Sequence, residues 1–211
     1  MPFRRLWAYE HGTLWTMVLD GAAPVPAAAP SVTFGEVPPE AAESLTTAMG
    51  PEQLPELRRR FAAGRRCFVA RVAGDIVAYG WVSQGVEHIG ELERTLHMRP
   101  DEAYIWDCAT LPAYRRKGLY TALLGYIAAT LQGEGVCRLW IGTSLQNRPS
   151  LQGMAAAGFQ PVITVLFVRI LTLSHLWVSG EATAPPAHVA AAQQALTGAR
   201  ARGRLHDGKA I

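Results

Sequence analysis

The chain has little cysteine, little charge and no long hydrophobic run, and each shortage excludes a class of protein. Its three cysteines, Cys67, Cys108 and Cys137, form no CxxC pair, which argues against a zinc site or a disulfide framework. Charged residues make up 18% of the 211 and hydrophobic residues 49%, so a highly charged disordered chain is excluded. The formal net charge of +3 is too small for a dedicated nucleic-acid binder.

No segment has the form of a signal peptide or a membrane span. The N-terminal residues MPFRRLWAYEHG carry arginines, but no apolar stretch of the signal-peptide type follows them. The most apolar run, Val162–Leu173, is interrupted by Arg169 and is shorter than the roughly 20 residues of a membrane helix. Together with the free cysteines, these features predict a cytoplasmic protein that contacts no membrane and no specific nucleic acid.

The order of the predicted elements favours one α/β domain with an extension at each end. Residues 1–29 predict a hairpin, with its turn at 10–13, and a Pro/Ala connector. Residues 30–178 begin with helices and a strand hairpin and continue as a βαβ alternation, which indicates one mixed sheet covered by helices. Residues 179–211 predict a flexible Ala/Arg-rich tail. The run 162–178 shows no clear turn, so the N-terminal hairpin or a partner chain, as in a homodimer, would pair with that edge.

The most informative segment is residues 104–124, where an apolar strand leads into a short basic turn and then a helix. Arg115, Arg116 and Lys117 precede Gly118, and the apolar periodicity predicts a helix over 119–132. The first turn of a helix has unpaired N–H groups and a partial positive charge, and glycine leaves room for an anion. The segment therefore fits a phosphate cradle; from the spacing alone, a solvated basic helix cap is the alternative.

The basic segment resembles the acetyl-CoA motif of the GNAT N-acetyltransferase superfamily. The family pattern Arg/Gln-x-x-Gly-x-Gly/Ala corresponds to the six residues RRKGLY at 115–120. Downstream, NRPS at 147–150 followed by Gly158-Phe159 resembles the second motif of the family. The resemblance implies a GNAT-like, mostly antiparallel sheet over residues 30–178. It also implies transfer of an acyl group, most simply acetyl, from acyl-CoA to a primary amine of a small molecule or peptide, without a metal.

The resemblance also implies roles for individual residues. The pantetheine arm would lie along the strand that ends at Thr110, and the pyrophosphate would meet the backbone amides at the start of the helix. A backbone amide near Cys108 would polarise the thioester carbonyl. The predicted cofactor-binding residues are Cys108, Ala109, Thr110, Arg115, Arg116, Lys117, Gly118, Leu119, Tyr120, Thr121 and Asn147. For Asn147, an N-cap of the following helix is the alternative.

Two positions depart from the family pattern. Tyr120 stands where the motif has glycine or alanine, and Met154 stands where many members carry a tyrosine that acts as general acid. Methionine cannot donate a proton, so another group or water must do so. Met154 therefore supports a second hypothesis, a CoA-binding regulatory module with little or no catalysis. A third, an unrelated nucleotide-binding fold, is disfavoured because the chain has no GxGxxG sequence.

Asp107 is the predicted general base or substrate anchor, with a structural acid bonded to backbone or arginine as the alternative. Strand alternation predicts that Asp107 faces away from Trp106 and Cys108. Cys108 is also a catalytic candidate, although a covalent role would need a partner that the sequence does not identify, and inert packing is the simpler interpretation. Other polar candidates for the acceptor site, each also explained by solvation or packing, are His88, Glu91, Glu93, His97, Glu102 and Tyr104.

Overall fold

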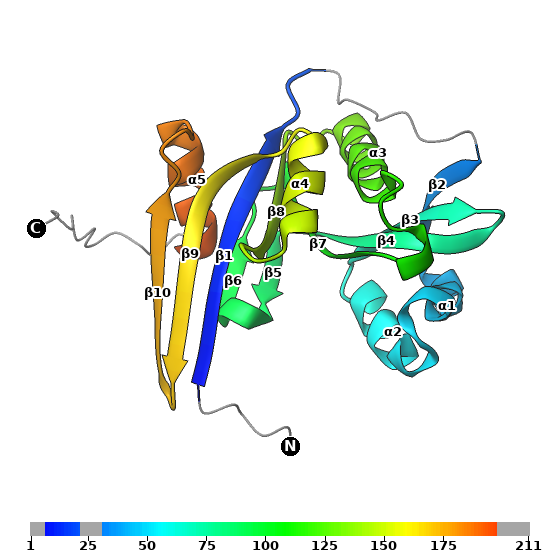
Figure 1. Cartoon of the computed structure of the whole chain (residues 1–211), viewed down its shortest axis with the longest axis horizontal. Coiled ribbons are helices and arrows are strands. Elements are labelled where there is room, and N and C mark those ends of the chain that lie inside the picture. The colour runs from blue at the N-terminus through cyan, green and yellow to red at the C-terminus, as the bar shows by residue number, and fades with distance from the viewer. Residues whose placement is uncertain (1–6, 22–30, 198–211) are drawn as a thin grey trace, which may run out of the picture.

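The computed structural model describes residues 7–21 and 31–197. Its centre is an eight-stranded sheet in the order β10-β9-β1-β8-β7-β4-β3-β2 (Figure 1). The strands are β1 (Trp7–Val18), β2 (Val32–Val37), β3 (Arg66–Val72), β4 (Asp75–Gln84), β7 (Glu102–Thr110), β8 (Arg138–Ser144), β9 (Gln160–Ile170) and β10 (Leu173–Gly180). Neighbouring strands are antiparallel except β7 and β8, which are parallel. The prediction of a mixed, mostly antiparallel sheet is confirmed.

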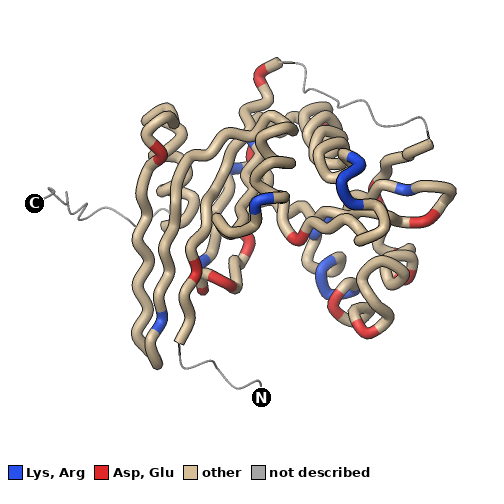
Figure 2. Tube along the Cα trace, viewed as in Figure 1, with Lys and Arg blue, Asp and Glu red and all other residues tan. Residues whose placement is uncertain are grey.

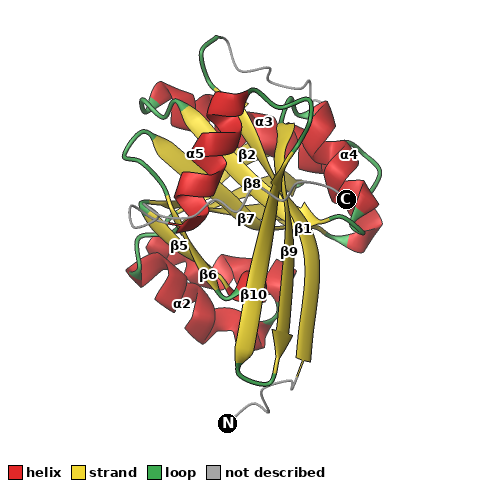
Figure 3. Cartoon of the chain, turned by 90° about the vertical axis from the view of Figure 1, so that its left-hand side faces the viewer, coloured by secondary structure: helices red, strands yellow, loops and turns green. Residues whose placement is uncertain are grey.

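Helices cover both faces of this sheet. They are α1 (Thr46–Met49), α2 (Leu54–Ala62), α3 (Leu119–Gly133), α4 (Arg148–Ala156) and α5 (Pro186–Thr197), and β5 (Val86–Ile89) and β6 (Arg94–His97) form a separate hairpin. Short 3-10 turns occupy Pro39–Leu45, Pro51–Gln53, Gly90–Leu92 and Pro112–Tyr114. In Figure 3, α3 and α4 lie on one side of the sheet, and α2, the β5–β6 hairpin and α5 lie on the other.

Three apolar clusters hold these layers together. The largest joins α3 and α4 to the sheet, and it buries the positions of α3 that the helical periodicity predicts to be apolar, such as Leu123, Ile127 and Leu131. On the opposite face, a second cluster packs α1 and α2 against β3 and β4. A third packs α5 and the β5–β6 hairpin against β1, β8 and β9. The second face is thus covered by two separate groups of elements.

The N-terminal segment differs from the predicted hairpin. Residues 7–18 form one uninterrupted strand, β1, which lies in the sheet between β8 and β9. Gly12 suggested a turn, but it marks a close approach instead, because a Cβ there would lie 3.3 Å from the Thr143 carbonyl oxygen and 3.4 Å from Val165. Residues 1–6 and the connector at 22–30 lie outside the described residues.

The C-terminal segment also differs from its prediction. The run 162–178 is a hairpin of β9 and β10, and Leu171 at its turn takes a left-handed conformation with φ 56°. Glycine or asparagine usually occupies a left-handed turn position, so a leucine there gives no sign of a turn in the sequence. Residues 186–197 form α5, whose Ala192, Ala195 and Leu196 are buried, so this part of the predicted tail is docked. Residues 198–211 lie outside the described residues. No described helix is long and apolar enough to span a membrane.

Candidate functional site

The basic turn forms an open, positively charged N-terminus of α3. Gly118 is the N-cap residue, with φ 72°, and no side chain caps the helix. A Cβ at Gly118 would meet nothing within 4 Å, so the space in front of the first turn is open. Figure 2 shows the cations of residues 115–117 as one continuous basic stretch beside α3. The free N–H groups, the helix dipole and these cations all favour an anion at this point.

The residues beside this turn connect it to the end of β7. Arg115 donates from Nε to the carbonyl oxygen of Thr110 over 3.2 Å, and Lys117 lies over the Tyr114 ring, 5.0 Å from its centroid. The Thr110 hydroxyl is buried and has no hydrogen-bond partner among the described residues. An unsatisfied buried hydroxyl at the end of the strand is a polar group available to a ligand that would extend from the cradle along β7.

Tyr120 points away from the cradle and toward α4. A Cβ at Gly153 would collide with Cδ1 of Tyr120, so the Tyr120 ring fills the space that a side chain at 153 would need. Burial raises the pKa of the Tyr120 hydroxyl above its usual range. The departure from glycine or alanine at this motif position is therefore accommodated by a glycine on the neighbouring helix, and it leaves the first-turn amides accessible.

The parallel strands β7 and β8 separate partway along their length. They pair from Glu102 with Arg138 to Ile105 with Ile141, and no pairing follows between residues 106–110 and 142–144. Beyond Ile105 the side of β7 that faces β8 therefore presents unpaired backbone groups. This divergence opens the sheet between the face that carries α3 and the face that carries α2 and α5.

Asp107 lies at the point of divergence, in a bulge. Its φ is 42°, and the register between β4 and β7 shifts between Tyr79 and Trp81 opposite it. The bulge overturns the predicted alternation, because Asp107 and Trp106 now line the same cavity instead of facing opposite sides. The Asp107 carboxylate accepts a hydrogen bond from Nη1 of Arg60 in α2, as in the alternative interpretation of a structural acid bonded to arginine.

Arg60 is held tightly in turn. It pairs with Glu56 over 3.2 Å, and its guanidinium lies 5.0 Å and 4.7 Å from the ring centroids of Trp81 and Trp106. Stacked and ion-paired arginines lose little conformational freedom, so Arg60 fixes the orientation of the Asp107 side chain. The sequence gives no signal for Arg60, because its partner is 47 residues away in the chain.

Cys108 points to the opposite side from Asp107. Its Sγ would lie 2.9 Å from a Cβ at Gly80, and its side chain packs against the cluster that contains Ile127. Burial is the main reason that its pKa is raised to about 12, so the thiol stays protonated at neutral pH. The Cys108 side chain is therefore not activated as a nucleophile, whereas the predicted role of its backbone amide stays a prediction.

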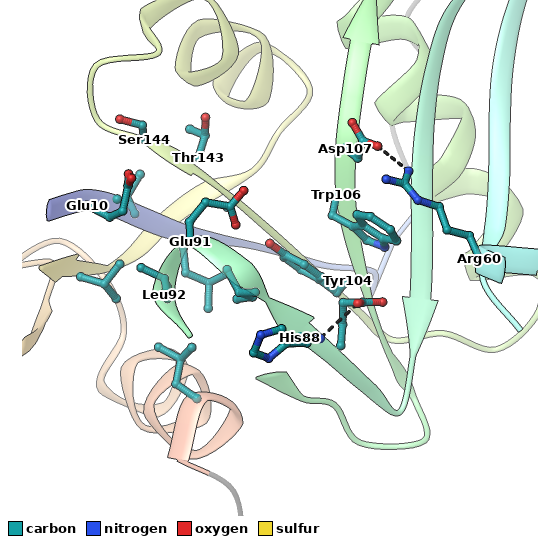
Figure 4. Close-up of a pocket in the computed structure, with 18 residues that line it drawn as sticks. Glu10, Arg60, His88, Glu91, Leu92, Tyr104, Trp106, Asp107, Thr143 and Ser144 are labelled. Atoms are coloured by element: carbon teal, nitrogen blue, oxygen red, sulfur yellow. Dashed lines mark hydrogen bonds and ion pairs between the residues drawn. The ribbon is translucent and has the colours of Figure 1, made fainter. Parts of the chain in front are cut away.

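On the other face of the sheet, a cavity of about 590 Å³ opens from this divergence (Figure 4). Its walls come from α2, the β5–β6 hairpin, α5 and the strands β1, β7, β8 and β9. The lining residues are Glu10, Gly12, Thr13, Leu14, Arg60, Glu87, His88, Ile89, Glu91, Leu92, Tyr104, Trp106, Asp107, Gly142, Thr143, Ser144, Val165 and Leu196. The cavity brings together Asp107, Tyr104, Glu91 and His88 from the sequence candidates and adds Glu10, which was not predicted.

A hydrogen-bonded network supports the floor of the cavity. Trp106 donates from Nε1 to the Ser83 hydroxyl over 2.8 Å, Ser83 donates to Glu87, and Arg65 makes two 2.7 Å bonds to the same carboxylate. Burial by itself would raise the pKa of Glu87, but the bonds from Arg65 and Ser83 outweigh it and lower the pKa. The network fixes the Trp106 ring that forms one wall.

The remaining candidates have other positions. Asn147 caps α4, accepting a 3.3 Å hydrogen bond from the Ser150 amide, and Met154 is fully buried. Glu102 is buried and accepts from Trp140 over 3.2 Å, and Glu93 pairs with Arg169 over 3.0 Å. Glu93, Glu102 and His97 do not line the cavity. Among the described residues, no group of three or more His, Cys, Asp or Glu could hold a metal ion.

A scan against protein families matches residues 37–159 to the acetyltransferase (GNAT) family. The matched range contains the cradle, the strand divergence and Asp107, but it excludes β1, α5 and the β9–β10 hairpin. No curated protein matches the sequence.

Solved structures of low sequence identity share the fold. A Drosophila protein is 14% identical, with a TM-score of 0.55 over 78% of this chain and 52% of its own. A GCN5-related N-acetyltransferase from Sphaerobacter thermophilus is 16% identical, with a TM-score of 0.52 over 79% of this chain and 54% of its own. A GNAT-family acetyltransferase from Colwellia psychrerythraea is 12% identical, with a TM-score of 0.53 over 76% and 56%. The chain spans about half the length of these proteins, and the likeness concerns the fold.

Proposed function

The chain belongs to the GNAT acetyltransferase family, and from this premise we propose that it transfers an acyl group, most simply acetyl, from acyl-CoA to a primary amine. The observation that carries the proposal is the divergence of β7 and β8. It connects an anion-binding helix terminus on one face of the sheet with a polar cavity on the other. A donor and an acceptor that enter from opposite faces would meet there.

The residues of the cradle fit the anionic end of coenzyme A. The uncapped α3 terminus, the cations at 115–117 and the open space before Gly118 suit a pyrophosphate. The unsatisfied Thr110 hydroxyl and the unpaired backbone of β7 suit an extended arm with amide groups. The predicted contacts of residues 108–110, 115–121 and 147 are proposed on this basis.

Acyl-CoA supplies a thioester: the amine nitrogen forms a bond to its carbonyl carbon, the carbon–sulfur bond breaks, and the products are an amide and a thiol. The protein must hold the nitrogen as a neutral amine and remove its proton. Asp107 is the proposed base, a role that its position at the mouth of the divergence and its ion pair with Arg60 support. A backbone amide near Cys108 is the proposed donor to the carbonyl oxygen.

The alternative function is CoA binding without catalysis, which Met154 favours. Methionine cannot donate a proton, and Met154 is fully buried between α4 and the sheet. Water or another group must therefore protonate the departing thiolate. Both functions predict CoA binding, and only the first predicts thiol release.

The test measures binding and turnover separately. Coenzyme A and acetyl-CoA should raise the Tm of the protein by mass action. Release of free thiol from acetyl-CoA is then followed with a panel of primary amines. Thiol release that depends on an amine supports the enzyme, a Tm shift without any release supports the regulatory module, and no Tm shift at millimolar coenzyme A contradicts both.

A further inference from the structure

The acceptor cavity contains carboxylates that the protein does not neutralise. Glu10 from β1 and Glu91 after β5 have no ion pair or hydrogen bond with another described residue, although both line the cavity. The other two acidic residues in the lining are paired, Asp107 with Arg60 and Glu87 with Arg65. The arginine in the lining, Arg60, is therefore already ion-paired. The two unpaired carboxylates give the cavity a negative charge, and the lining also contains His88.

A buried hydroxyl points into the same space. Tyr104 is only 7% exposed, and its hydroxyl has no hydrogen-bond partner among the described residues. Figure 4 shows the ring extending into the cavity with its hydroxyl toward Glu91. Burial, and then the Glu91 carboxylate, raise the pKa of this hydroxyl, which places the two groups within electrostatic reach of each other. A hydroxyl without a protein partner beside an unpaired carboxylate favours a polar ligand, which can bond to both groups.

Apolar side chains form another part of the lining, beside the hydroxyls of Thr13, Thr143 and Ser144. Leu14, Ile89, Leu92, Val165 and Leu196 contribute side chains from four different elements and the Gly90–Leu92 turn. Such a wall suits an alkyl stem and gives it no hydrogen bonds.

Register places Glu10 away from the reacting end. Gly12 pairs with Ser144 at the end of β8, and Glu10 lies two residues further out. At about 3.3 Å per strand residue, Glu10 lies about 7 Å beyond Ser144, and Ser144 lies about 10 Å beyond Ile141, the last β8 residue that pairs with β7. Glu10 therefore marks the outer end of the cavity, toward which a ligand whose amine lies at the divergence would point its other polar group.

We infer that the acceptor is a dication: a primary amine joined by a short alkyl stem to a second ammonium or guanidinium group, which Glu10 and Glu91 bind beside the Tyr104 hydroxyl. The inference rests on the proposed acyl transfer for the fate of the reacting amine, but the binding of the second cation is independent of turnover. The carboxylates accept hydrogen bonds from the second cation, and the Tyr104 hydroxyl oxygen accepts a further one.

The test compares pentane-1,5-diamine with pentylamine, which shares its stem and lacks the second ammonium. Calorimetry with the full chain and coenzyme A should show the diamine binding at least about tenfold more tightly than the monoamine. In the thiol-release assay, the diamine should have the lower KM, with a similar kcat. Equal affinity for the two amines, or no detectable binding of either at millimolar concentration, overturns the inference.

Variants of Glu10, Glu91 and Tyr104 test whether these residues cause the preference for the diamine over pentylamine. Glu10→Gln together with Glu91→Gln should remove most of the preference for the diamine and leave pentylamine unaffected, whereas Glu40→Gln, an exposed residue outside the cavity, should leave the preference intact. Tyr104→Phe should weaken diamine binding without lowering the Tm, because the hydroxyl has no protein partner to lose. A preference that survives the double variant overturns the inference.

Failure of acyl transfer gives a different result from failure of this inference. If the diamine binds selectively but no thiol is released with any amine, the proposed catalysis is wrong and the dication site stands. If thiol is released equally well with both amines, acyl transfer stands and the dication site is wrong.

Discussion

The two halves of the sheet are built in different ways from the chain. The half formed by β2, β3, β4 and β7 comes from residues 32–110 in sequence order, and it leads directly into the cradle at the start of α3. The half formed by β1, β9 and β10 brings together residues 7–18 and 160–180 from opposite ends of the chain. The family match at 37–159 covers β3, β4 and β7 of the first half, together with β8 between the halves, and it omits β1, β9 and β10.

This difference separates cofactor recognition from acceptor recognition. The cradle and the divergence lie within the matched range, where backbone amides, a glycine and cations are the groups proposed to bind coenzyme A. Glu10, Val165 and Leu196, which close the acceptor cavity, come from β1, β9 and α5 outside that range. The segments beyond the match are therefore expected to help set which amine is used, together with Glu91 and Tyr104 inside it.

The largest expected effect comes from removing β1. Deletion of residues 1–18 would leave β8 and β9 without the strand that pairs with both of them and would expose apolar residues beneath α5. We expect loss of the cooperative unfolding transition in urea. If the truncated chain unfolds cooperatively and binds coenzyme A, the first half of the sheet folds alone and β1 is a dispensable addition.

Gly118→Asp tests the cofactor half. A carboxylate facing the pyrophosphate, at a residue with positive φ, should weaken coenzyme A binding at least about 100-fold by calorimetry. Gly64→Asp is the matched control, because Gly64 has φ 76° and open space around it but lies after α2. Similar loss of binding in both variants would mean that backbone strain, and not charge at the cradle, is responsible.

Asp107→Asn tests the junction between the halves. Asparagine tolerates the left-handed backbone at this bulge and preserves the shape of the side chain, so kcat should fall about 100-fold with an unchanged Tm shift from coenzyme A. Asp101→Asn removes an exposed carboxylate paired with Arg99 and should leave kcat unchanged. Normal turnover of the Asp107 variant would show that Asp107 is not the base and acts only as a structural partner of Arg60.

Gly153→Ala tests the contact between α3 and α4. The new Cβ would collide with the Tyr120 ring, so we expect destabilisation of about 1–3 kcal/mol in urea unfolding. The double variant with Tyr120→Ala removes the collision and should be more stable than the sum of the single changes predicts. Additive effects would show that the two side chains do not share this space.

The pH dependence of stability tests the role of Glu87, which lines the cavity. Its pKa is lowered in the folded protein from a reference of 4.5, so its stabilising contribution is present above that pH and is lost as the pH falls. Glu87→Gln should lower stability by about 1–3 kcal/mol at pH 7. The difference in the free energy of unfolding between this variant and the unaltered protein should become smaller between pH 5 and pH 3. A difference that does not change with pH would contradict a role for the Glu87 charge.

The sequence predicted the parts of the molecule that depend on local signals. The helix over 119–132, the 67–83 strand pair and the glycine at the cradle follow from periodicity and turn chemistry, and the family assignment on these motifs is confirmed. Pairings between distant residues had no such signal. A turn was predicted at Gly12 because its contacts with Thr143 and Val165 are tertiary and leave no local signal. Asp107 was predicted to face away from both Trp106 and Cys108, and only the relation to Cys108 holds, because nothing local specifies the bulge.

The position of β1 has a consequence for synthesis of the chain. β1 pairs with residues 138–144 and 160–170, which follow it far along the chain, so it cannot reach its place in the sheet until those residues have been made. Contacts between such distant segments form slowly, and an unpaired apolar strand is prone to associate with other chains in the meantime. Closure of the acceptor cavity is therefore expected to be a late event in folding, after the cofactor-binding half has assembled.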